Sequence, residues 1–232
     1  MGGIINASEC ITITSVIILP VVTFLLINAK TVVKIVYERG NFTSQDTAQV
    51  SSLFAIYIIG SIIYAYRCVI KTVFFSTKDA KTPMINEMYY LIICITCNLL
   101  QVRVFKMDLD ALGIAWVISI TVVTPLLFIK FRKKYSNISI IDKSTIIEFL
   151  KAVFSSIIII ILSKIINSYI IINNIFIKIL LHGFLSVSVY LLSMIIIKSK
   201  TICEFLFLII KKAEIIMQLP PKHIIKPAHP MA

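Results

Sequence analysis

The chain has 232 residues, of which 59% are hydrophobic and only 15% are charged. A soluble chain has about 25% charged residues, so this composition excludes a soluble domain and predicts an all-α membrane protein. The net charge of +12 comes from short basic clusters between apolar runs, which are typical of membrane-protein loops, and we therefore expect no nucleic-acid partner.

Six apolar runs approach the length of about 20 residues that crosses a bilayer as a helix. In chain order they are Ile11–Asn28, Thr47–Tyr66, Met88–Val102, Ala111–Ile129, Ala152–Asn167 and Ile179–Ile197. The amphipathic stretch Ala29–Tyr37 continues the first run. Pro20 and Pro125 lie inside runs and are expected to kink these helices without ending them, because neighbouring groups satisfy the freed carbonyls. The predicted fold class is an all-α polytopic membrane protein with six transmembrane helices.

Basic residues are divided unequally between the two ends of the expected helices. Of the 23 lysines and arginines, fifteen follow the second, fourth and sixth runs and seven lie on the opposite side. The remaining one, Arg67, lies within the membrane. Because basic loops stay in the cytoplasm, the sequence predicts that both termini are cytoplasmic.

The chain contains no arrangement of residues that is typical of an enzyme. There is no P-loop, no Ser–His–Asp set and no pair of carboxylates within an expected span. Cys94 and Cys97 are one helical turn apart, without the histidine or second pair that would indicate zinc. We expect neither a cofactor nor a metal, and we interpret His182 as a packed or hydrogen-bonded histidine.

Two motifs carry a more specific signal. The first reads V-Y-E-R-G-N-F-T from Val36 to Thr43, and the second reads F-F-S-T-K-D-A-K-T-P from Phe74 to Pro83. Together they resemble the MurJ (MviN) family of lipid II flippases, in the multidrug/oligosaccharidyl-lipid/polysaccharide exporter superfamily. Members of that family read E-R-G-x-F-T-x-x-D-T, Y-x-x-G, R-D-V-L and F-Y-x-x-x-D-x-K-T-P at about this spacing. The matching residues are Glu38, Arg39, Gly40, Phe42, Asp46, Tyr57, Gly60, Asp79, Lys81 and Pro83.

The resemblance covers residues 13–134 and implies a fold of fourteen helices, of which this chain is similar to helices nine to fourteen. Residues 1–134 would form four helices of the second bundle, 135–200 two additional helices that hold a lipid tail in a groove, and 201–232 a cytoplasmic amphipathic segment and tail. Because Met1 falls just before helix nine, the chain resembles a truncated copy, a split-gene half or a gene fragment.

The function that the resemblance implies is transport rather than catalysis. The chain would be the C-terminal portion of a lipid II flippase, which moves the undecaprenyl-linked peptidoglycan precursor across the bacterial plasma membrane and is inactive alone. Its partners would be membrane lipid, the lipid-linked precursor and a separate chain supplying helices one to eight. Two alternatives stay open: a non-transporting remnant or membrane assembly subunit, and a related polysaccharide-unit exporter.

Most motif residues have a structural interpretation. Glu38 to Gly40 are expected to form a turn, with Gly40 as a left-handed helix cap; substrate contact is the alternative. Asp79 suits the positive end of the helix that begins near Pro83. Lys81 is expected to meet anionic headgroups or to reflect the orientation of the chain.

Arg67 and Asn98 are the candidates for substrate binding or gating. Arg67 would lie about 15 Å deep, where charge is costly and points to function, and a guanidinium binds a pyrophosphate through two hydrogen bonds. Family members have Arg-Asp where this chain has Arg67 and Cys68; packing with snorkelling is the alternative. Some members hold sodium with an N-x-x-x-N/D pair, of which only Asn98 remains after Cys94, so we expect no ion site and a helix–helix hydrogen bond as the alternative role.

Overall fold

The computed structural model describes residues 7–106, 108–136, 141–169 and 174–204. Its seven named helices are α1 (Ala7–Ile27), α2 (Ala29–Tyr37), α3 (Ser44–Ser76), α4 (Lys81–Arg103), α5 (Asp110–Lys134), α6 (Lys143–Tyr169) and α7 (Ile175–Ile196). All except α2 are long and apolar enough to cross a membrane, which confirms the six expected spans. Most of the expected cytoplasmic tail, residues 205–232, lies outside the described residues.

Several helices extend beyond the uncharged runs that predicted them. Helix α4 begins at Lys81, before its uncharged run and close to the start near Pro83 that the second motif predicted, and α6 begins at Lys143 rather than Ala152. The added turns contain charged residues with partners; for example, Lys151 Nζ lies 2.8 Å from Glu148 Oε1. An uncharged run therefore underestimates a membrane helix whose end carries paired charges, and the start of α6 that its run predicted was wrong.

The first span and its amphipathic continuation are separated by a break at Asn28. This residue has φ −103° and ψ 11°, and its side-chain amide donates to the carbonyl of Phe24 over 2.9 Å. By contrast, Pro20 and Pro125 lie within the continuous helices α1 and α5, as expected.

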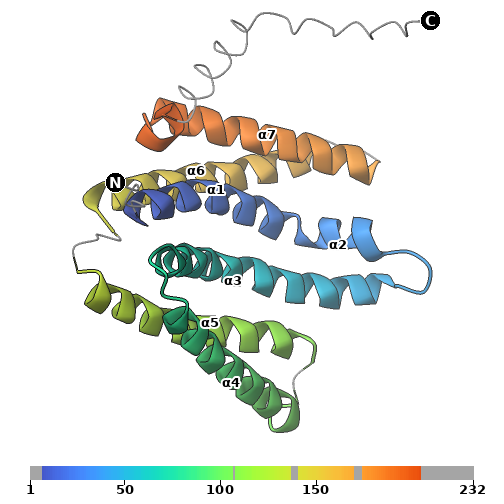
Figure 1. Cartoon of the computed structure of the whole chain (residues 1–232). Coiled ribbons are helices and arrows are strands. Elements are labelled where there is room, and N and C mark those ends of the chain that lie inside the picture. Colours follow the sequence, from blue (N-terminus) through green and yellow to red (C-terminus); the bar gives the residue numbers. More distant parts are fainter. Residues whose placement is uncertain (1–6, 107, 137–140, 170–173, 205–232) are drawn as a thin grey trace, which may run out of the picture.

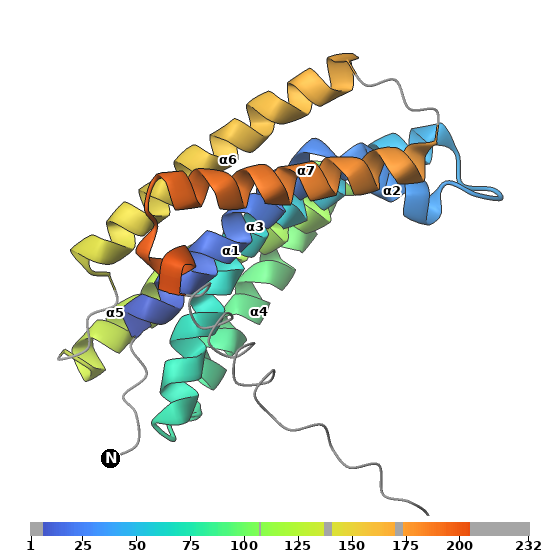
Figure 2. The same cartoon turned by 90° about the horizontal axis from the view of Figure 1, so that it is seen from above.

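Helix α1 lies at the centre of the fold, between α3 on one side and α6 on the other (Figure 1). Helix α5 packs against both α3 and α4, whereas α3 and α4 make few direct contacts. Figure 2 shows α7 above α1, meeting α6 near the end of α7 and diverging from it toward the end of α6. One buried cluster joins α1, α3 and α5 and contains Ala7, Ile11, Ile70, Val73, Phe74, Leu127 and Phe131. The second joins α1, α6, α7 and the segment after α7, and contains Val16, Ala152, Ile159, Tyr190, Met194 and Ile202.

A buried polar contact also attaches α6 and α7 to the break after α1. His182 of α7 places Nδ1 3.0 Å from Asn28 Oδ1 and Nε2 2.7 Å from Ser163 Oγ of α6. The expectation of a hydrogen-bonded histidine is confirmed. These contacts fix three helices at one level of the fold.

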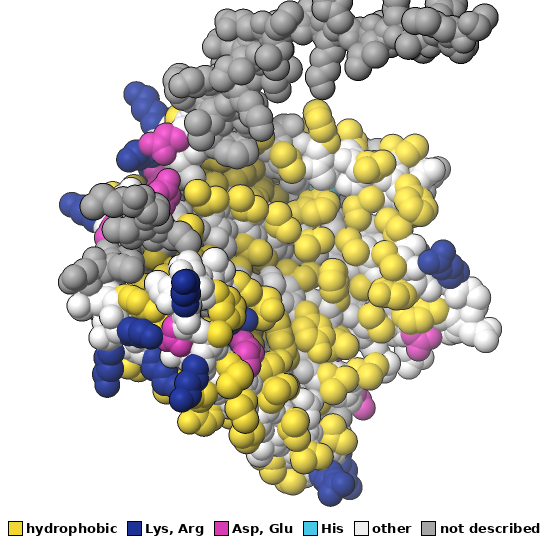
Figure 3. All heavy atoms as spheres, in the orientation of Figure 1, with side chains coloured by type: hydrophobic (Ala, Val, Ile, Leu, Met, Phe, Trp, Pro, Cys, Tyr) yellow, Lys and Arg dark blue, Asp and Glu magenta, His cyan; other side chains and the backbone are white. Residues whose placement is uncertain are grey.

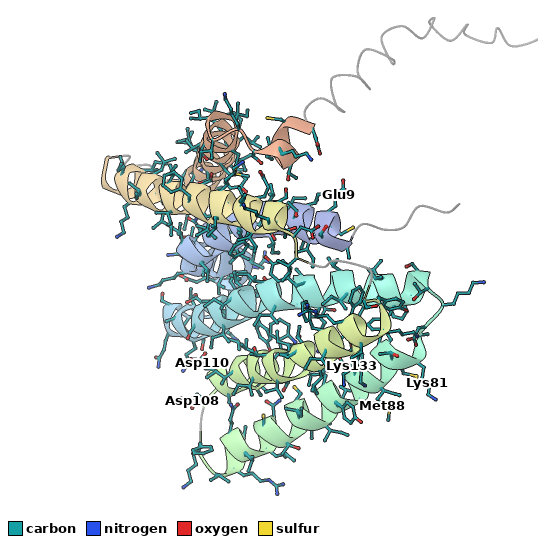
Figure 4. All side chains as sticks on the ribbon, turned by 90° about the vertical axis from the view of Figure 1, so that its left-hand side faces the viewer. Glu9, Lys81, Met88, Asp108, Asp110 and Lys133 are labelled. Carbon is teal, nitrogen blue, oxygen red and sulfur yellow. The ribbon has the colours of Figure 1, made fainter. Side chains whose placement is uncertain are left out.

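Charged side chains gather at one end of the molecule. In Figure 3, hydrophobic side chains cover most of the visible face, while Lys and Arg are concentrated at its left end, where α3 and α5 finish. Figure 4 shows Lys81 and Glu9 at the end opposite Asp108 and Asp110. The helices thus run between a strongly basic end and an end with fewer charges.

Candidate functional site: a buried arginine between three helices

The Arg67 side chain is buried between α3, α4 and α5, with 1% of its surface exposed. It lies nine residues before the end of α3, which is about 14 Å along the helix axis. It faces a cavity of about 370 Å³ that is lined by Tyr64, Arg67, Glu87, Tyr90, Trp116 and Ile120. This distance along the helix is close to the value of about 15 Å that the sequence analysis used.

Glu87 of α4 is the counterion of this arginine. Its Oε1 atom lies 3.1 Å from Arg67 Nη2 and 3.0 Å from Lys71 Nζ. Only the lysine contact is aligned as a hydrogen bond; no guanidinium nitrogen has a hydrogen-bond partner among the residues that the structure describes. The sequence analysis missed Glu87, although it is the only acidic residue in α4. In the resembling family an aspartate follows this arginine, where this chain has Cys68. Here Glu87 supplies a carboxylate from another helix instead.

Aromatic rings hold both cations of the site. The guanidinium carbon of Arg67 lies 5.4 Å from the centre of the Tyr90 ring, and Lys71 Nζ lies 5.3 Å from the centre of the Tyr64 ring. A ring face attracts a cation without accepting its N–H groups in ordinary hydrogen bonds. The arrangement therefore stabilises two positive charges while leaving hydrogen-bond donors available.

Gly60 and Tyr57 shape the aromatic wall of the cavity. A Cβ atom at Gly60 would overlap the Trp116 ring and come within 2.8 Å of Val117 Cγ2, so only glycine lets α5 approach this closely. The Tyr57 and Tyr64 rings lie 5.2 and 6.1 Å from Trp116. The sequence analysis did not identify Trp116 as a neighbour of Arg67.

Asn98 does not belong to this cavity. It lies eleven positions beyond Glu87 on α4, about 16 Å along the helix. Its side-chain nitrogen donates to the carbonyl of Cys94 over 2.9 Å, and its Oδ1 is buried without a described partner. The structure therefore separates the two candidate residues. Within the described residues, no three His, Cys, Asp or Glu side chains gather in a group that could hold a metal ion.

The E-R-G motif forms the turn between α2 and α3. Thr47 donates to Glu38 Oε2 over 2.7 Å, and Lys34 Nζ lies 3.5 Å from Oε1; the Thr47 hydrogen bond is the main cause that lowers the pKa of Glu38. Gly40 has φ +61°, but it does not cap α2 as expected. The helix ends at Tyr37, and Gly40 lies beyond it, in the turn closed by the Phe42 amide donating to the carbonyl of Arg39.

The neighbouring motif residues complete this turn. The Phe42 ring lies 6.0 Å from that of Tyr37. Asp46 and Thr43 form a reciprocal capping box at the start of α3, in which Asp46 Oδ2 accepts from the Thr43 amide over 2.8 Å. Arg39 donates to the carbonyl of Val36 over 2.9 Å at the surface.

The second motif joins α3 to α4. Asp79 accepts from the amide and the hydroxyl of Thr82, over 3.0 and 2.8 Å, as a residue at a helix start does. Lys134 at the end of α5 lies 2.6 Å away and, with the Thr82 bonds, lowers the pKa of Asp79 to about 2. Pro83 is buried in the first turn of α4, and Lys81 is exposed.

A larger groove of about 840 Å³ lies between α1 and α7. Its apolar side includes Val16, Pro20, Phe24 and Val187. Polar residues gather toward the basic end and include Ser8, Glu9, Thr145, Lys200 and Glu204. The groove is therefore amphipathic along its length.

Comparison with known proteins gives consistent matches. A family model described as lipid II flippase MurJ matches residues 6–182. The probable lipid II flippases MurJ of Rickettsia prowazekii and Bdellovibrio bacteriovorus are 27% and 26% identical to this chain over 43% and 50% of its length. That of Buchnera aphidicola is 22% identical over 71% of the chain. The matched regions are 20%, 22% and 32% of the three relatives, so the matches cover a third of their length or less.

A solved structure has the same fold. It is that of a lipid II flippase MurJ in an inward closed conformation, which aligns with 82% of this chain and 38% of its own at a TM-score of 0.68 and 21% identity. This agreement confirms the all-α arrangement of membrane helices.

Proposed function

The chain belongs to the lipid II flippase MurJ family, and from this membership we propose that it acts as the C-terminal portion of a flippase for the undecaprenyl-linked peptidoglycan precursor. The observation that carries the proposal is the Arg67 guanidinium, buried within a membrane helix and facing a cavity. Charge at this depth is costly and is retained where it serves transport. A transporter of this kind needs no catalytic residue.

The groove between α1 and α7 suits the other part of such a substrate. An undecaprenyl chain is a long hydrocarbon, and the groove has an apolar wall that includes Val16 and Phe24. Its polar residues lie toward the basic end, where a headgroup would remain hydrated. We assign the lipid tail to this groove and the pyrophosphate to the level of Arg67.

The proposal also assigns a position in the membrane. The basic end, which includes Lys81 and Lys134, faces the cytoplasm, and the protein resides in the bacterial plasma membrane. Residues 1–134 form the second half of a transport bundle, 135–200 the two additional helices, and 201–232 a cytoplasmic segment. A separate chain is the candidate source of helices one to eight.

The chain alone is proposed to be inactive. Alternating access moves one bundle against another around a central site, and the matched relatives are about twice as long as this chain. Arg67 and Lys71 with Glu87 provide one net positive charge, whereas a pyrophosphate diester carries two negative charges. A charge at mid-membrane costs about 2.5–3.5 kcal/mol when unpaired, so one charge of the headgroup would be uncompensated while Glu87 stays in place.

Complementation tests this function. The native flippase is depleted in a bacterium, and the chain is expressed alone, with a fragment carrying helices one to eight, or with that fragment and Arg67→Gln. We expect growth only when the unsubstituted chain and the fragment are present together.

Each other result has a distinct meaning. Rescue by the chain alone would refute its inactivity. Rescue by neither would favour the remnant or assembly subunit, and rescue of a polysaccharide exporter mutant instead would favour the related exporter. Equal rescue with Arg67→Gln would remove Arg67 from the transport site.

A further inference from the structure

We propose that Glu87 is a displaceable counterion, which occupies the site of Arg67 and Lys71 until a phosphate or pyrophosphate oxyanion takes its place. The inference rests on the proposed function, because it specifies how the same cavity would receive the headgroup. The first step is the geometry of the carboxylate. Both cations lie against one oxygen, Oε1, at 3.1 and 3.0 Å. A carboxylate committed to an arginine normally binds it through two parallel hydrogen bonds.

The second step concerns the donors of Arg67. Its Nε and Nη1 atoms are buried and lack a hydrogen-bond partner among the described residues, and Nη2 has only the ion-pair contact with Glu87 Oε1 at 3.1 Å. Buried donors in native proteins are nearly always paired, because an unpaired donor loses its hydration without compensation. A residue held over the Tyr90 ring with unused donors is thus positioned for an acceptor that enters the cavity.

The third step is access. Glu87 is 39% exposed although its partner Arg67 is only 1% exposed, so the carboxylate can leave without crossing a packed core. Lys71 lies five residues from the end of α3, about 8 Å along the axis, and Arg67 about 14 Å. The two cations form successive contacts from the helix end inward, along the path of an entering headgroup.

The fourth step is charge balance. With Glu87 in place, the site has one net positive charge. When the carboxylate leaves, Arg67 and Lys71 provide two positive charges against the two negative charges of a pyrophosphate diester. The exchange replaces one anion by another and leaves neither cation without a counterion.

The test measures binding to the purified, full chain in detergent. Trp116 lines the cavity and is the single tryptophan of the chain, so its fluorescence reports occupancy. The probes are farnesyl pyrophosphate, inorganic pyrophosphate and micelles doped with phosphatidylglycerol. The variants are Glu87→Gln, Arg67→Gln and Arg67→Lys. Asp108→Asn, an exposed acidic residue at the opposite end, is the matched control.

We expect Glu87→Gln to bind farnesyl pyrophosphate about fivefold more tightly than the unsubstituted chain, which corresponds to the loss of one part-exposed competing ion pair. Arg67→Gln should weaken binding more than tenfold, Arg67→Lys less, and Asp108→Asn should leave it unchanged. If Glu87→Gln does not remain folded, Glu87→Asp serves instead, because its shorter side chain retracts the carboxylate and should also tighten binding.

Unchanged or weaker binding by the folded Glu87 variant overturns the proposal, and so does the absence of binding by every probe. Preferential binding of farnesyl pyrophosphate supports the proposal and identifies the oxyanion as that of a prenyl-linked headgroup. Equal binding of phosphatidylglycerol or inorganic pyrophosphate, with the same effect of the Glu87 variant, supports the proposal and shows that the site accepts phosphate groups from several kinds of molecule. Complementation is read separately: a Glu87 effect without rescue leaves the exchange standing and removes the flippase function.

Discussion

Individual buried polar side chains connect helices that are distant in sequence. Glu148 of α6 accepts a hydrogen bond from Ser199, and its Oε1 lies 3.2 Å from the Lys200 amide. This fixes the chain after α7 against the beginning of α6. His182 performs the same task deeper in the fold. In a membrane such groups must be satisfied internally, so each partner restricts where its helix can lie.

Replacing His182 with leucine tests this role at the level of one residue. The substitution approximately keeps the volume but removes the contacts to Asn28 and Ser163. We expect a loss of about 1 kcal/mol in the free energy of unfolding. A hydrogen bond in a membrane protein contributes somewhat less than this on average, and the Asn28 amide that is left without its histidine partner adds a further cost. Thermal unfolding in detergent gives the measurement.

Ser186→Ala is the matched control for this change. Ser186 is buried one turn farther along α7, and its hydroxyl has no hydrogen-bond partner in the described part of the chain. Its removal should alter the melting temperature little. A loss as large as that of His182→Leu would attribute the effect to packing of α7 rather than to the polar contact.

Close approach between helices depends on small residues at two levels of the α3–α5 contact. A Cβ at Gly113 of α5 would lie 3.0 Å from Ile56 Cγ2 of α3, and Gly60 of α3 receives the Trp116 ring of α5. Helices in membranes gain attraction mainly from such packing, since lipid is as apolar as their side chains. The Arg67 cavity lies beside the Gly60 contact and depends on its geometry.

Gly60→Ala should therefore displace Trp116 and destabilise the protein by about 1–3 kcal/mol, the usual cost of overpacking. Thermal unfolding measures the stability, and the fluorescence of the single tryptophan reports the displacement. Gly183→Ala is the control, because the nearest atom to its Cβ would be Phe24 Cζ at 3.4 Å and helical alanine is favoured over glycine. Equal effects of the two substitutions would contradict the interpretation.

The helices themselves were predictable, because a membrane span depends on local hydropathy and length. Their ends were predictable only in part: the motif around Pro83 indicated where α4 begins, whereas α6 begins at Lys143, earlier than its uncharged run indicates. Arg67 was recognisable as an unusual charge within a span. Its counterion Glu87 is twenty positions away on another helix, and its pairing depends on how α3, α4 and α5 pack, which no local pattern specifies. Gly40 was recognised as a turn residue, but it was expected to cap α2, whereas it lies in the turn beyond the end of that helix.

At the scale of the whole molecule, the fold places loops that are far apart in sequence at the same end. Asp79 after α3 and Lys134 at the end of α5 form an ion pair, and Lys151 of α6 donates to the carbonyl of Lys198 over 3.0 Å. The basic residues that follow the second, fourth and sixth apolar runs in the sequence thus lie close together at one end of the structure. This common location is what the rule of positive cytoplasmic loops requires of a folded bundle.

Labelling with a membrane-impermeant maleimide tests the orientation of this basic end. The five natural cysteines are first replaced by serine or alanine, and single cysteines are then introduced at Asn41, Asp108 or Lys133. All three positions are exposed. Asn41 lies in the turn between α2 and α3, Asp108 lies before α5 at the less charged end, and Lys133 lies near the end of α5. Because moving basic loops across the bilayer is unfavourable, we expect labelling of intact cells at Asn41 and Asp108 only. Lys133→Cys should react once the cells are permeabilised, which shows that its thiol is accessible. Labelling of Lys133→Cys in intact cells, with protection of the other two, would reverse the orientation and place the Arg67 cavity nearer the outer leaflet.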